Sequence, residues 1–236
     1  MIVAVTGATG HLGGHLVPYL IERGHLVVPV WRTMPLGLHA DICLHLAGPR
    51  DWRDESQVDA LEAFNRQVIL WRTEHEHARV VACGSWWQYA GPEAEALPYT
   101  AMKADQMAWA DVTVVMFSIY GTTPRTRRGF IPELVAAWRD GTDLGPVSRQ
   151  LREWLHPLDA CAALEAGMAA PDGVYEARSW DVYSPYALAL SCGLGHLPER
   201  PAVPSAHPVH RYPQVPGWSA RRSVLHHLHD SRKAAA

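Results

Sequence analysis

The sequence predicts an α/β protein with a doubly wound parallel sheet and a small, mostly helical C-terminal cap. Short apolar runs alternate with amphipathic helical segments over the first 120 or so residues, a pattern typical of a parallel sheet covered by helices. A glycine-rich turn joins the first strand to the first helix. Beyond Gly121 the buried strands become sparse, so we expect a sheet domain at 1–121 and a cap at 122–236, with some cap segments returning to the sheet.

Hydrophobic periodicity and helix-end signals place the individual elements. Strands are expected at 2–6, 26–30, 42–46, 80–83, 112–117 and 174–175. Helices are expected from residue 12 to Gly24, from Asp54 or Ser56 to about Glu76, and at 99–110, 131–140, near 157 and at 219–231. The Pro- and His-rich stretch 198–217 is expected to form a loop.

Composition excludes several classes of protein. The chain has 236 residues, 48% of them hydrophobic, with a formal net charge of -3, which gives no reason to expect nucleic acid or a membrane as a partner. Its four cysteines are far apart and read as structural, so we expect a reduced, cytoplasmic protein. His226 and His229 share a helix face but lack further ligands at metal-site spacing, so no metal site is expected.

The glycine turn follows the first strand directly and opens the first helix. It reads Thr6-Gly7-x-x-Gly10-x-x-Gly13. Glycines in this context allow a tight turn, close approach of the backbone to a pyrophosphate and close packing of helix on strand, while the helix N-terminus favours phosphate. The turn therefore predicts a dinucleotide-binding site and, with the alternating elements, a Rossmann-type fold.

The second strand ends in Trp31-Arg32 rather than in an acid. An acidic residue at that place would favour NAD by accepting hydrogen bonds from the ribose 2′-hydroxyl. Arg32 can instead hold a 2′-phosphate and Trp31 can stack on adenine, so the sequence favours NADP, with NAD as the alternative. Only eight residues separate Arg32 from Asp41, too few for a helix and a further strand.

Tyr99 and Lys103 are four residues apart on a predicted helix and can share a face. Lys103 is one of only two lysines among 21 basic residues, the other being Lys233. A compact ammonium beside a phenol favours the phenolate. We therefore expect Lys103 to lower the pKa of Tyr99 towards neutrality, as general acid–base catalysis at a hydroxyl or carbonyl requires.

Together these motifs resemble the extended short-chain dehydrogenase/reductase family, which includes nucleotide-sugar epimerases, dehydratases and ketoreductases. The chain resembles a shortened member. The matching segments are Thr6–Gly13, His45–Gly48, Asn65, Gly84–Tyr89, Tyr99-x-x-x-Lys103, Phe117–Gly121, Arg152–Asp159 and Pro216–Trp218. The resemblance implies NAD(P)-dependent hydride transfer and a nucleotide-sugar substrate, and it suggests a homodimer formed through the helices that carry Asn65 and Tyr99.

The resemblance also assigns roles to individual residues. The implied catalytic residues are Ser85, Tyr99, Lys103 and Asn65. The implied cofactor-binding residues are Gly7, Thr9, Gly10, His11, Leu12, Gly13, Trp31, Arg32, Leu46, Ala47, Gly48, Tyr99 and Lys103. The implied substrate-binding residues are Trp86, Trp87, Ser118 and Arg152.

Departures from the family pattern narrow the expected chemistry. Trp86 and Trp87 stand where dehydratases carry an Asp-Glu pair, and an indole cannot act as a general acid, which argues against dehydration. Ser118 replaces an asparagine that binds substrate in many members. The leading hypothesis is a reductase of a keto group on a nucleotide-linked sugar. The alternatives are a nucleotide-sugar epimerase with retained NAD, a reductase of a small non-sugar carbonyl, and a non-catalytic dinucleotide-binding sensor.

Overall fold

The structure is a computed structural model that describes residues 1–31, 33–49, 54–89, 97–121, 129–194 and 210–233. Its main sheet has six parallel strands in the order β2-β1-β3-β4-β5-β8. The strand bounds are β1 Ile2–Thr6, β2 Leu26–Val30, β3 Ile42–His45, β4 Arg79–Ser85, β5 Val112–Met116 and β8 Gly173–Glu176. The predicted doubly wound α/β fold is confirmed, and each predicted strand is found within about two residues of its expected bounds.

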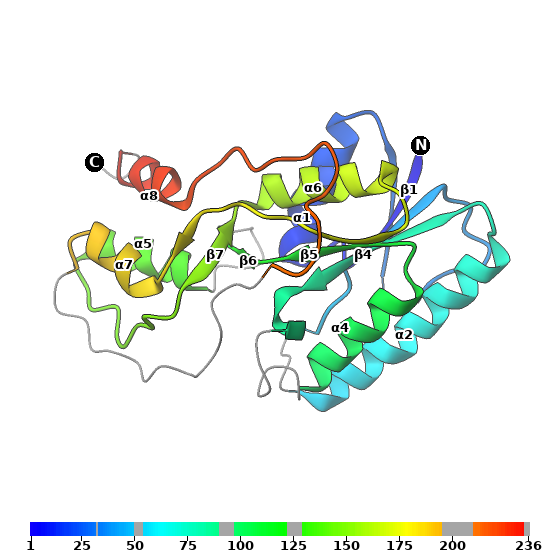
Figure 1. Ribbon diagram of the computed structural model, residues 1–236, viewed down its shortest axis with the longest axis horizontal. Helices are drawn as coiled ribbons and strands as arrows, with labels where there is room; N and C mark the ends of the chain where they lie inside the picture. The colour runs from blue at the N-terminus through cyan, green and yellow to red at the C-terminus, as the bar shows by residue number, and fades with distance from the viewer. Residues whose placement is uncertain (32, 50–53, 90–96, 122–128, 195–209, 234–236) are drawn as a thin grey trace.

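Helices cover both faces of this sheet (Figure 1). On one face, α1 (His11–Glu22) and α6 (Pro157–Ala169) pack against strand residues such as Val3, Val5 and Val114. On the other face, α2 (Glu55–Glu74) and α4 (Pro98–Trp109) enclose Ala4, Cys43 and Val80. Successive residues of a strand point to opposite faces, so β1 contributes Val3 and Val5 to one core and Ala4 to the other.

The helix ends follow the signals in the sequence. Asp54 caps α2 by accepting a hydrogen bond from the Ser56 backbone N–H at 3.1 Å, as an N-cap carboxylate does. At the end of α1, Gly24 has a φ of 82° and its N–H bonds to the Ile21 carbonyl. A residue with a side chain would be strained there, which explains why the helix stops at a glycine.

Strand β2 forms the edge of the main sheet. Among the described residues between Val30 and Ile42 there is neither a helix nor a strand, as the shortness of this segment predicted. Pro29 lies within β2 and lacks an N–H to offer a further strand, which is tolerated at a sheet edge. The chain therefore passes from β2 to β3 through a loop.

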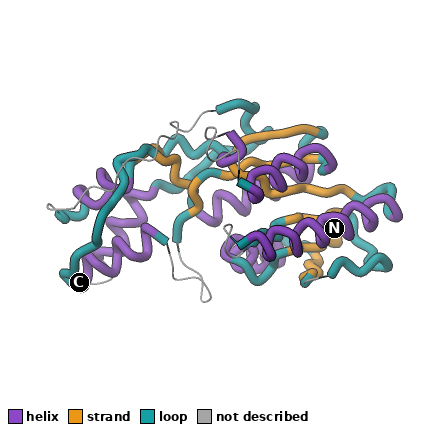
Figure 2. The backbone as a smooth tube through the Cα atoms, turned by 90° about the horizontal axis from the view of Figure 1, so that it is seen from below, coloured by secondary structure: helices purple, strands orange, loops and turns teal. Residues whose placement is uncertain are grey.

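A second, smaller unit lies beside the carboxyl ends of the main strands (Figures 1 and 2). It contains a three-stranded sheet in the order β6-β7-β9, formed by Ser118–Ile119, Arg152–Leu155 and Val182–Tyr183. Helices α5 (Phe130–Asp140), α7 (Pro185–Ser191) and α8 (Val224–Lys233) accompany it. Helix α7 and strands β7 and β9 were not predicted from the sequence. All three are short, and the two residues of β9 show no periodicity.

The final helix begins later than predicted. Its expected range was 219–231, but α8 starts at Val224. The backbone N–H groups of Arg221 and Arg222 instead donate to the Asp159 carboxylate at 3.0 and 2.9 Å. This tertiary contact holds residues 221–222 outside the helix, and helical periodicity alone cannot reveal it. The predicted loop 198–217 falls largely on residues 195–209, outside the described part of the chain.

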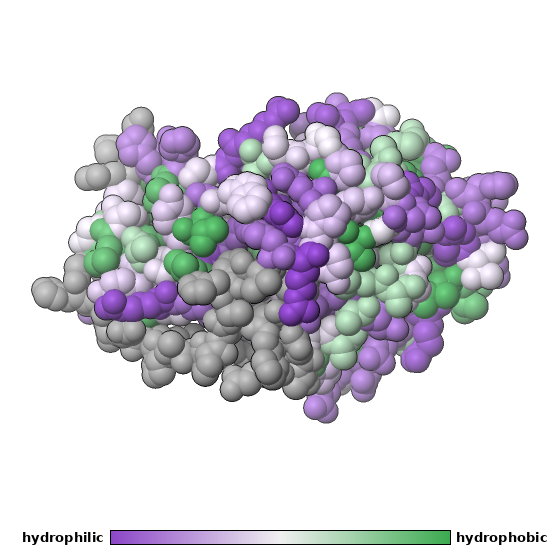
Figure 3. All heavy atoms as spheres, in the orientation of Figure 1, coloured by the Kyte–Doolittle hydropathy of each residue, from purple (hydrophilic) through white to green (hydrophobic). Residues whose placement is uncertain are grey.

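Within the described residues, no helix combines the length and apolar character needed to cross a membrane. The face drawn in Figure 3 is mostly hydrophilic, with separate hydrophobic patches over the small unit and over the opposite end of the molecule.

Candidate active site

The glycine turn is packed too closely for side chains at two of its positions. A Cβ on Gly7, whose φ is +66°, would lie 2.9 Å from the Ala47 backbone nitrogen, and a Cβ on Gly13 would lie 2.2 Å from the Gly7 carbonyl oxygen. Gly10 keeps a negative φ and donates its N–H to the Gly7 carbonyl at 2.9 Å. The first and third glycines are therefore required by close approach.

Helix α1 begins at His11 with an open N-terminus. Its N-cap residue is Gly10, which has no side chain to cap the helix, and its first turn contains no acidic residue. Thr9 is exposed, whereas Leu12 is buried in the core. Free backbone N–H groups and the positive end of the helix dipole favour a phosphate at such a place. The turn thus has the shape and charge for a pyrophosphate.

Two strands place polar side chains next to this turn. Thr6 ends β1 and His45 ends β3, and the two residues are register partners. The hydroxyl oxygen of Thr6 lies 2.8 Å from Nδ1 of His45 and accepts hydrogen bonds from the backbone N–H groups of Leu46 and Ala47 at 3.1 and 3.2 Å. These bonds fix Leu46 and Ala47 against Gly7, while Gly48 is exposed.

Lys103 reaches from α4 to the end of β4 and is only 3% exposed. Its Nζ atom donates to the Cys83 carbonyl oxygen at 2.8 Å and to Oε1 of Gln106 at 2.9 Å. Burial lowers the pKa of the Lys103 ammonium, and the neighbouring Cys83 opposes this effect. Asn65, on α2, contacts Gln106 and His45 at 3.1 and 2.9 Å, so it reaches Lys103 through Gln106.

Tyr99 departs from the prediction made for it. Burial raises its pKa to about 12, and a hydrogen bond with Ser85 opposes the rise. The causes of this shift are burial, Ser85 and Cys83 and do not include Lys103, whose ammonium donates to the Cys83 carbonyl and to Gln106. The expectation that Lys103 lowers the pKa of Tyr99 towards neutrality is therefore wrong for this structure. The phenol stays protonated and bonded to Ser85.

Ser85 is held by the short helix that follows β4, η1 (Trp86–Tyr89). Its backbone N–H donates to Oε1 of Gln88 at 3.0 Å. Gly84 leaves room for this contact, since a Cβ there would lie 3.3 Å from the same oxygen and 2.9 Å from Thr113. The structure thus brings Ser85, Tyr99 and Lys103 to the carboxyl end of β4, where ligands bind in open α/β sheets.

The twin tryptophans have different surroundings. Trp86 is buried and stacks on Phe117, with ring centroids 6.5 Å apart. Trp87 is 36% exposed. Their packing favours a core role for Trp86 and leaves Trp87 as the indole that a ligand can contact.

The other predicted substrate and cofactor residues are spread over two regions. Ser118 lies in β6 and Arg152 in β7, both in the small unit. Trp31 is 62% exposed and follows Val30, the register partner of Thr6, so it lies beside the glycine turn. Arg32 lies outside the described residues.

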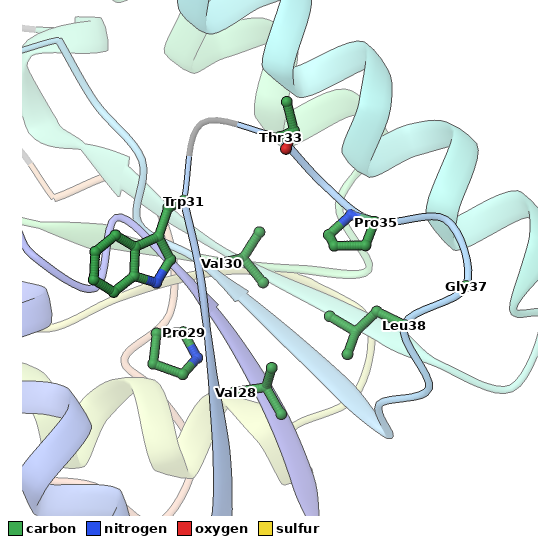
Figure 4. A pocket seen from close by; sticks show the side chains of 8 residues that line it. All are labelled: Val28, Pro29, Val30, Trp31, Thr33, Pro35, Gly37 and Leu38. Carbon is green, nitrogen blue, oxygen red and sulfur yellow. The ribbon is translucent and has the colours of Figure 1, made fainter.

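A pocket of about 420 Å³ surrounds the end of β2. In Figure 4, Val28, Val30, Pro35 and Leu38 gather on one side of the strand, and Pro29 and Trp31 lie on the other. This open edge lies where the sequence leaves no room for a further strand, and it exposes the Trp31 ring to a ligand.

Three residues of this site, Thr6, His45 and Gln106, were not among those predicted from the sequence. Gln106 is fully buried and lies three residues after Lys103, so helical spacing alone places both on one face. Thr6 and His45 end adjacent strands beside the glycine turn. That Thr6 and His45 lie next to each other can be predicted only once the order of the strands is known.

The chain matches no protein-family model and no curated protein, but its fold is shared by solved structures. UDP-N-acetylglucosamine 4-epimerase from Bacillus cereus superposes with a TM-score of 0.77 at 15% identity, covering 100% of this chain and 99% of that one. MoeE5, solved with UDP-glucose and NAD, gives 0.75 at 20% identity, covering 100% of both chains. dTDP-glucose 4,6-dehydratase from Bacillus anthracis, solved with NAD, gives 0.74 at 13% identity, covering 99% of this chain and 96% of that one.

Proposed function

We propose that the protein is an NAD(P)-dependent oxidoreductase of the extended short-chain dehydrogenase/reductase type that reduces a keto group on a nucleotide-linked sugar. The observation that carries this proposal is the meeting of Ser85, Tyr99 and Lys103 at the end of β4, next to an open glycine turn. The shared fold adds weight, because several of the solved structures that have it were determined with NAD or UDP-glucose.

The residues present fit a dinucleotide. The crowding at Gly7 and Gly13 leaves space only for backbone, and the uncapped start of α1 offers N–H groups to a pyrophosphate. Trp31 would stack on the adenine and Arg32 would hold a 2′-phosphate, which favours NADP over NAD. The ammonium of Lys103 would bind the nicotinamide ribose. When bound, the nicotinamide supplies or accepts the hydride.

The protonation state of Tyr99 supports reduction over oxidation as the first step. Because burial raises the pKa of Tyr99 to about 12, the phenol holds its proton at neutral pH. The Ser85 hydroxyl has one proton, so it would donate to the reacting oxygen in place of its bond to Tyr99. Tyr99 can then give its proton to a keto oxygen as hydride reaches the adjacent carbon. Starting instead from an alcohol would require a base, and a buried phenol is a poor one.

An epimerase is the second candidate, since several of the solved structures with this fold are epimerases. An epimerase retains its nicotinamide and regenerates it, whereas a reductase consumes NADPH. Absorbance and mass analysis of the purified protein would distinguish them. Tightly retained NAD, with no net NADPH consumption on 4-keto nucleotide sugars, would contradict the reductase.

The proposed site also predicts which variants lose turnover. Tyr99→Phe removes the proton donor and should lower kcat by about 100-fold or more. Lys103→Arg should also lose activity, since a planar guanidinium does not fit a pocket built for an ammonium. Wild-type activity in Tyr99→Phe would instead favour the alternative of a non-catalytic dinucleotide-binding sensor.

Two further properties concern the assembly and the location of the protein. Helices α2 and α4 lie side by side on one face of the sheet (Figure 1), and we propose that they form a homodimer interface. Light scattering on the purified protein would test this. We also propose a cytoplasmic location, on the grounds of cysteine usage.

A further inference from the structure

We propose that Gln106 is a positioning residue that holds the Lys103 ammonium in place. Asn65, His45 and Thr6 extend this contact into a chain of hydrogen bonds that reaches the glycine turn, with donors from both sides converging on Oδ1 of Asn65. The role of Lys103 in the reaction rests on the proposed function. The donor and the acceptor at each link of this hydrogen-bond chain follow from the contacts alone.

The chain starts at Lys103, because an ammonium can only donate hydrogen bonds. The atom of Gln106 that lies 2.9 Å from Nζ must therefore be the carbonyl oxygen, Oε1. This assignment turns the amide nitrogen of Gln106 towards Asn65, whose Oδ1 lies 3.1 Å away. An amide nitrogen donates, so the facing atom of Asn65 must be its oxygen.

The same oxygen of Asn65 lies 2.9 Å from Nε2 of His45. Since that oxygen can only accept, Nε2 must carry a proton and donate. The 3.0 Å contact between the Gln106 nitrogen and Nε2 of His45 is then an approach of two donors that converge on one oxygen. The imidazole is left with an unprotonated Nδ1, which must accept.

Thr6 leads to the same tautomer from the other end of the chain. Its hydroxyl oxygen accepts from the backbone N–H groups of Leu46 and Ala47, which uses both lone pairs. The hydroxyl proton is then free for Nδ1 of His45, at 2.8 Å. Two independent arguments thus give one assignment, with the proton of His45 on Nε2.

Burial keeps the His45 imidazole of this hydrogen-bond chain neutral. His45 is fully buried, and burial, aided by the charge of Lys103, lowers its pKa to about 3. A second positive charge therefore does not form beside the ammonium near neutral pH. Gln106 is the link between Lys103 and the neutral groups, and both are buried on the inner face of α4.

The scarcity of lysine makes this proposal testable without an activity assay. Protein labelled with 13C at the lysine ε-carbon gives two signals, and Lys233→Arg assigns the one from Lys103. Gln106→Met keeps the side-chain length but removes the acceptor, so the pKa of Lys103 should fall below its wild-type value. Gln67→Met is the matched control, since Gln67 lies on α2 rather than on α4 and its side chain accepts from the Met34 N–H of the loop after β2. A Lys103 titration unchanged in folded Gln106→Met would overturn the proposal.

The His45 tautomer needs no variant and is read from the 15N shifts of the wild-type imidazoles at pH 7. The proton is expected on Nε2. A proton on Nδ1, or an imidazolium, would contradict the chain even if Gln106→Met failed to fold.

Turnover provides a third measurement. Gln106→Met should lower kcat/KM on the order of 10- to 100-fold through misplacement of the ammonium, and Gln67→Met should leave it unchanged. Equal kcat/KM in Gln106→Met and wild type would contradict a positioning role. If the wild type shows no turnover at all, the proposed function fails, but the two NMR results still decide whether the chain exists.

Discussion

The hydroxyl oxygen of Thr6 lies 2.8 Å from Nδ1 of His45, and this contact joins the ends of β1 and β3 at the residue before the glycine turn. The Thr6 hydroxyl also accepts hydrogen bonds from the backbone N–H groups of Leu46 and Ala47, which pack against Gly7. The Thr6 hydroxyl therefore fixes the glycine turn after β1 and the segment after β3 relative to one another, and both border the proposed cofactor site.

Thr6→Val should destabilise the protein by about 1–3 kcal/mol, because it keeps the shape but leaves the partly buried N–H groups of residues 46 and 47 without their acceptor. Urea unfolding followed by circular dichroism measures the loss. Thr73→Val is the control, since Thr73 is exposed and its hydroxyl donates to the Ile69 carbonyl of its own helix. Equal losses in the two variants would mean that Thr6 has no special role.

Gly13→Ala should distort the glycine turn, because its Cβ would lie 2.2 Å from the Gly7 carbonyl oxygen. We expect a stability loss of about 1–3 kcal/mol from overpacking, together with weaker binding of NADPH in a fluorescence titration. Gly37→Ala has no atom within 4 Å of the added Cβ and should change stability by less than about 0.5 kcal/mol. Normal NADPH affinity in Gly13→Ala would argue against a pyrophosphate at this turn.

His156 should make the fold sensitive to acid. Burial, and then the charge of Arg222, lowers its pKa to about 4, and its Nδ1 caps α6 by accepting the Leu158 N–H at 3.1 Å. The unfolded chain binds a proton near pH 6.5 while the folded state does not, so this contribution to stability is present above pH 6.5 and is lost as the pH falls towards 4.

His156→Asn keeps an N-cap acceptor but cannot titrate, so its stability should fall less between pH 7 and pH 5. Urea midpoints at both pH values give the comparison. The exposed His77→Asn provides the reference. Parallel pH dependence in wild type and His156→Asn would contradict the neutral cap.

The pH profile of ketone reduction should reflect the buried phenol of Tyr99. With a pKa raised to about 12, Tyr99 keeps its proton from pH 6 to pH 9. Because the protonated form is the active one, its contribution to kcat/KM should stay constant over that range and fall only at higher pH. Loss of rate above pH 7, removed by Tyr99→Phe, would show that the phenol titrates near neutrality after all.

Hydrophobic periodicity predicted the main sheet well because strands such as β5, Val112–Met116, are buried along their whole length and stand out as apolar runs. The strands of the small unit were harder to predict from periodicity, because β6 and β9 have two residues each and depend on pairing with β7. The late start of α8 depends on Asp159, 65 residues before Val224.

The candidate site was predicted only in part. Ser85, Tyr99 and Lys103 come together because strand ends and helix faces follow from the alternation of elements. The direction of the Lys103 side chain could not be predicted from this alternation, because it is set by Gln106 and by a carbonyl of β4 rather than by Tyr99. A buried glutamine is indistinguishable in the sequence from an exposed one.

The central claim is that hydride passes from a reduced nicotinamide to a keto carbon of a nucleotide-linked sugar. The most direct measurement uses NADPH carrying two deuterium atoms at carbon 4, incubated with the protein and a 4-keto nucleotide sugar, with the product analysed by mass spectrometry. We predict a reduced sugar nucleotide that has gained one deuterium, formed by wild type and lost in Tyr99→Phe. A product without deuterium, or equal product from wild type and Tyr99→Phe, would contradict the account.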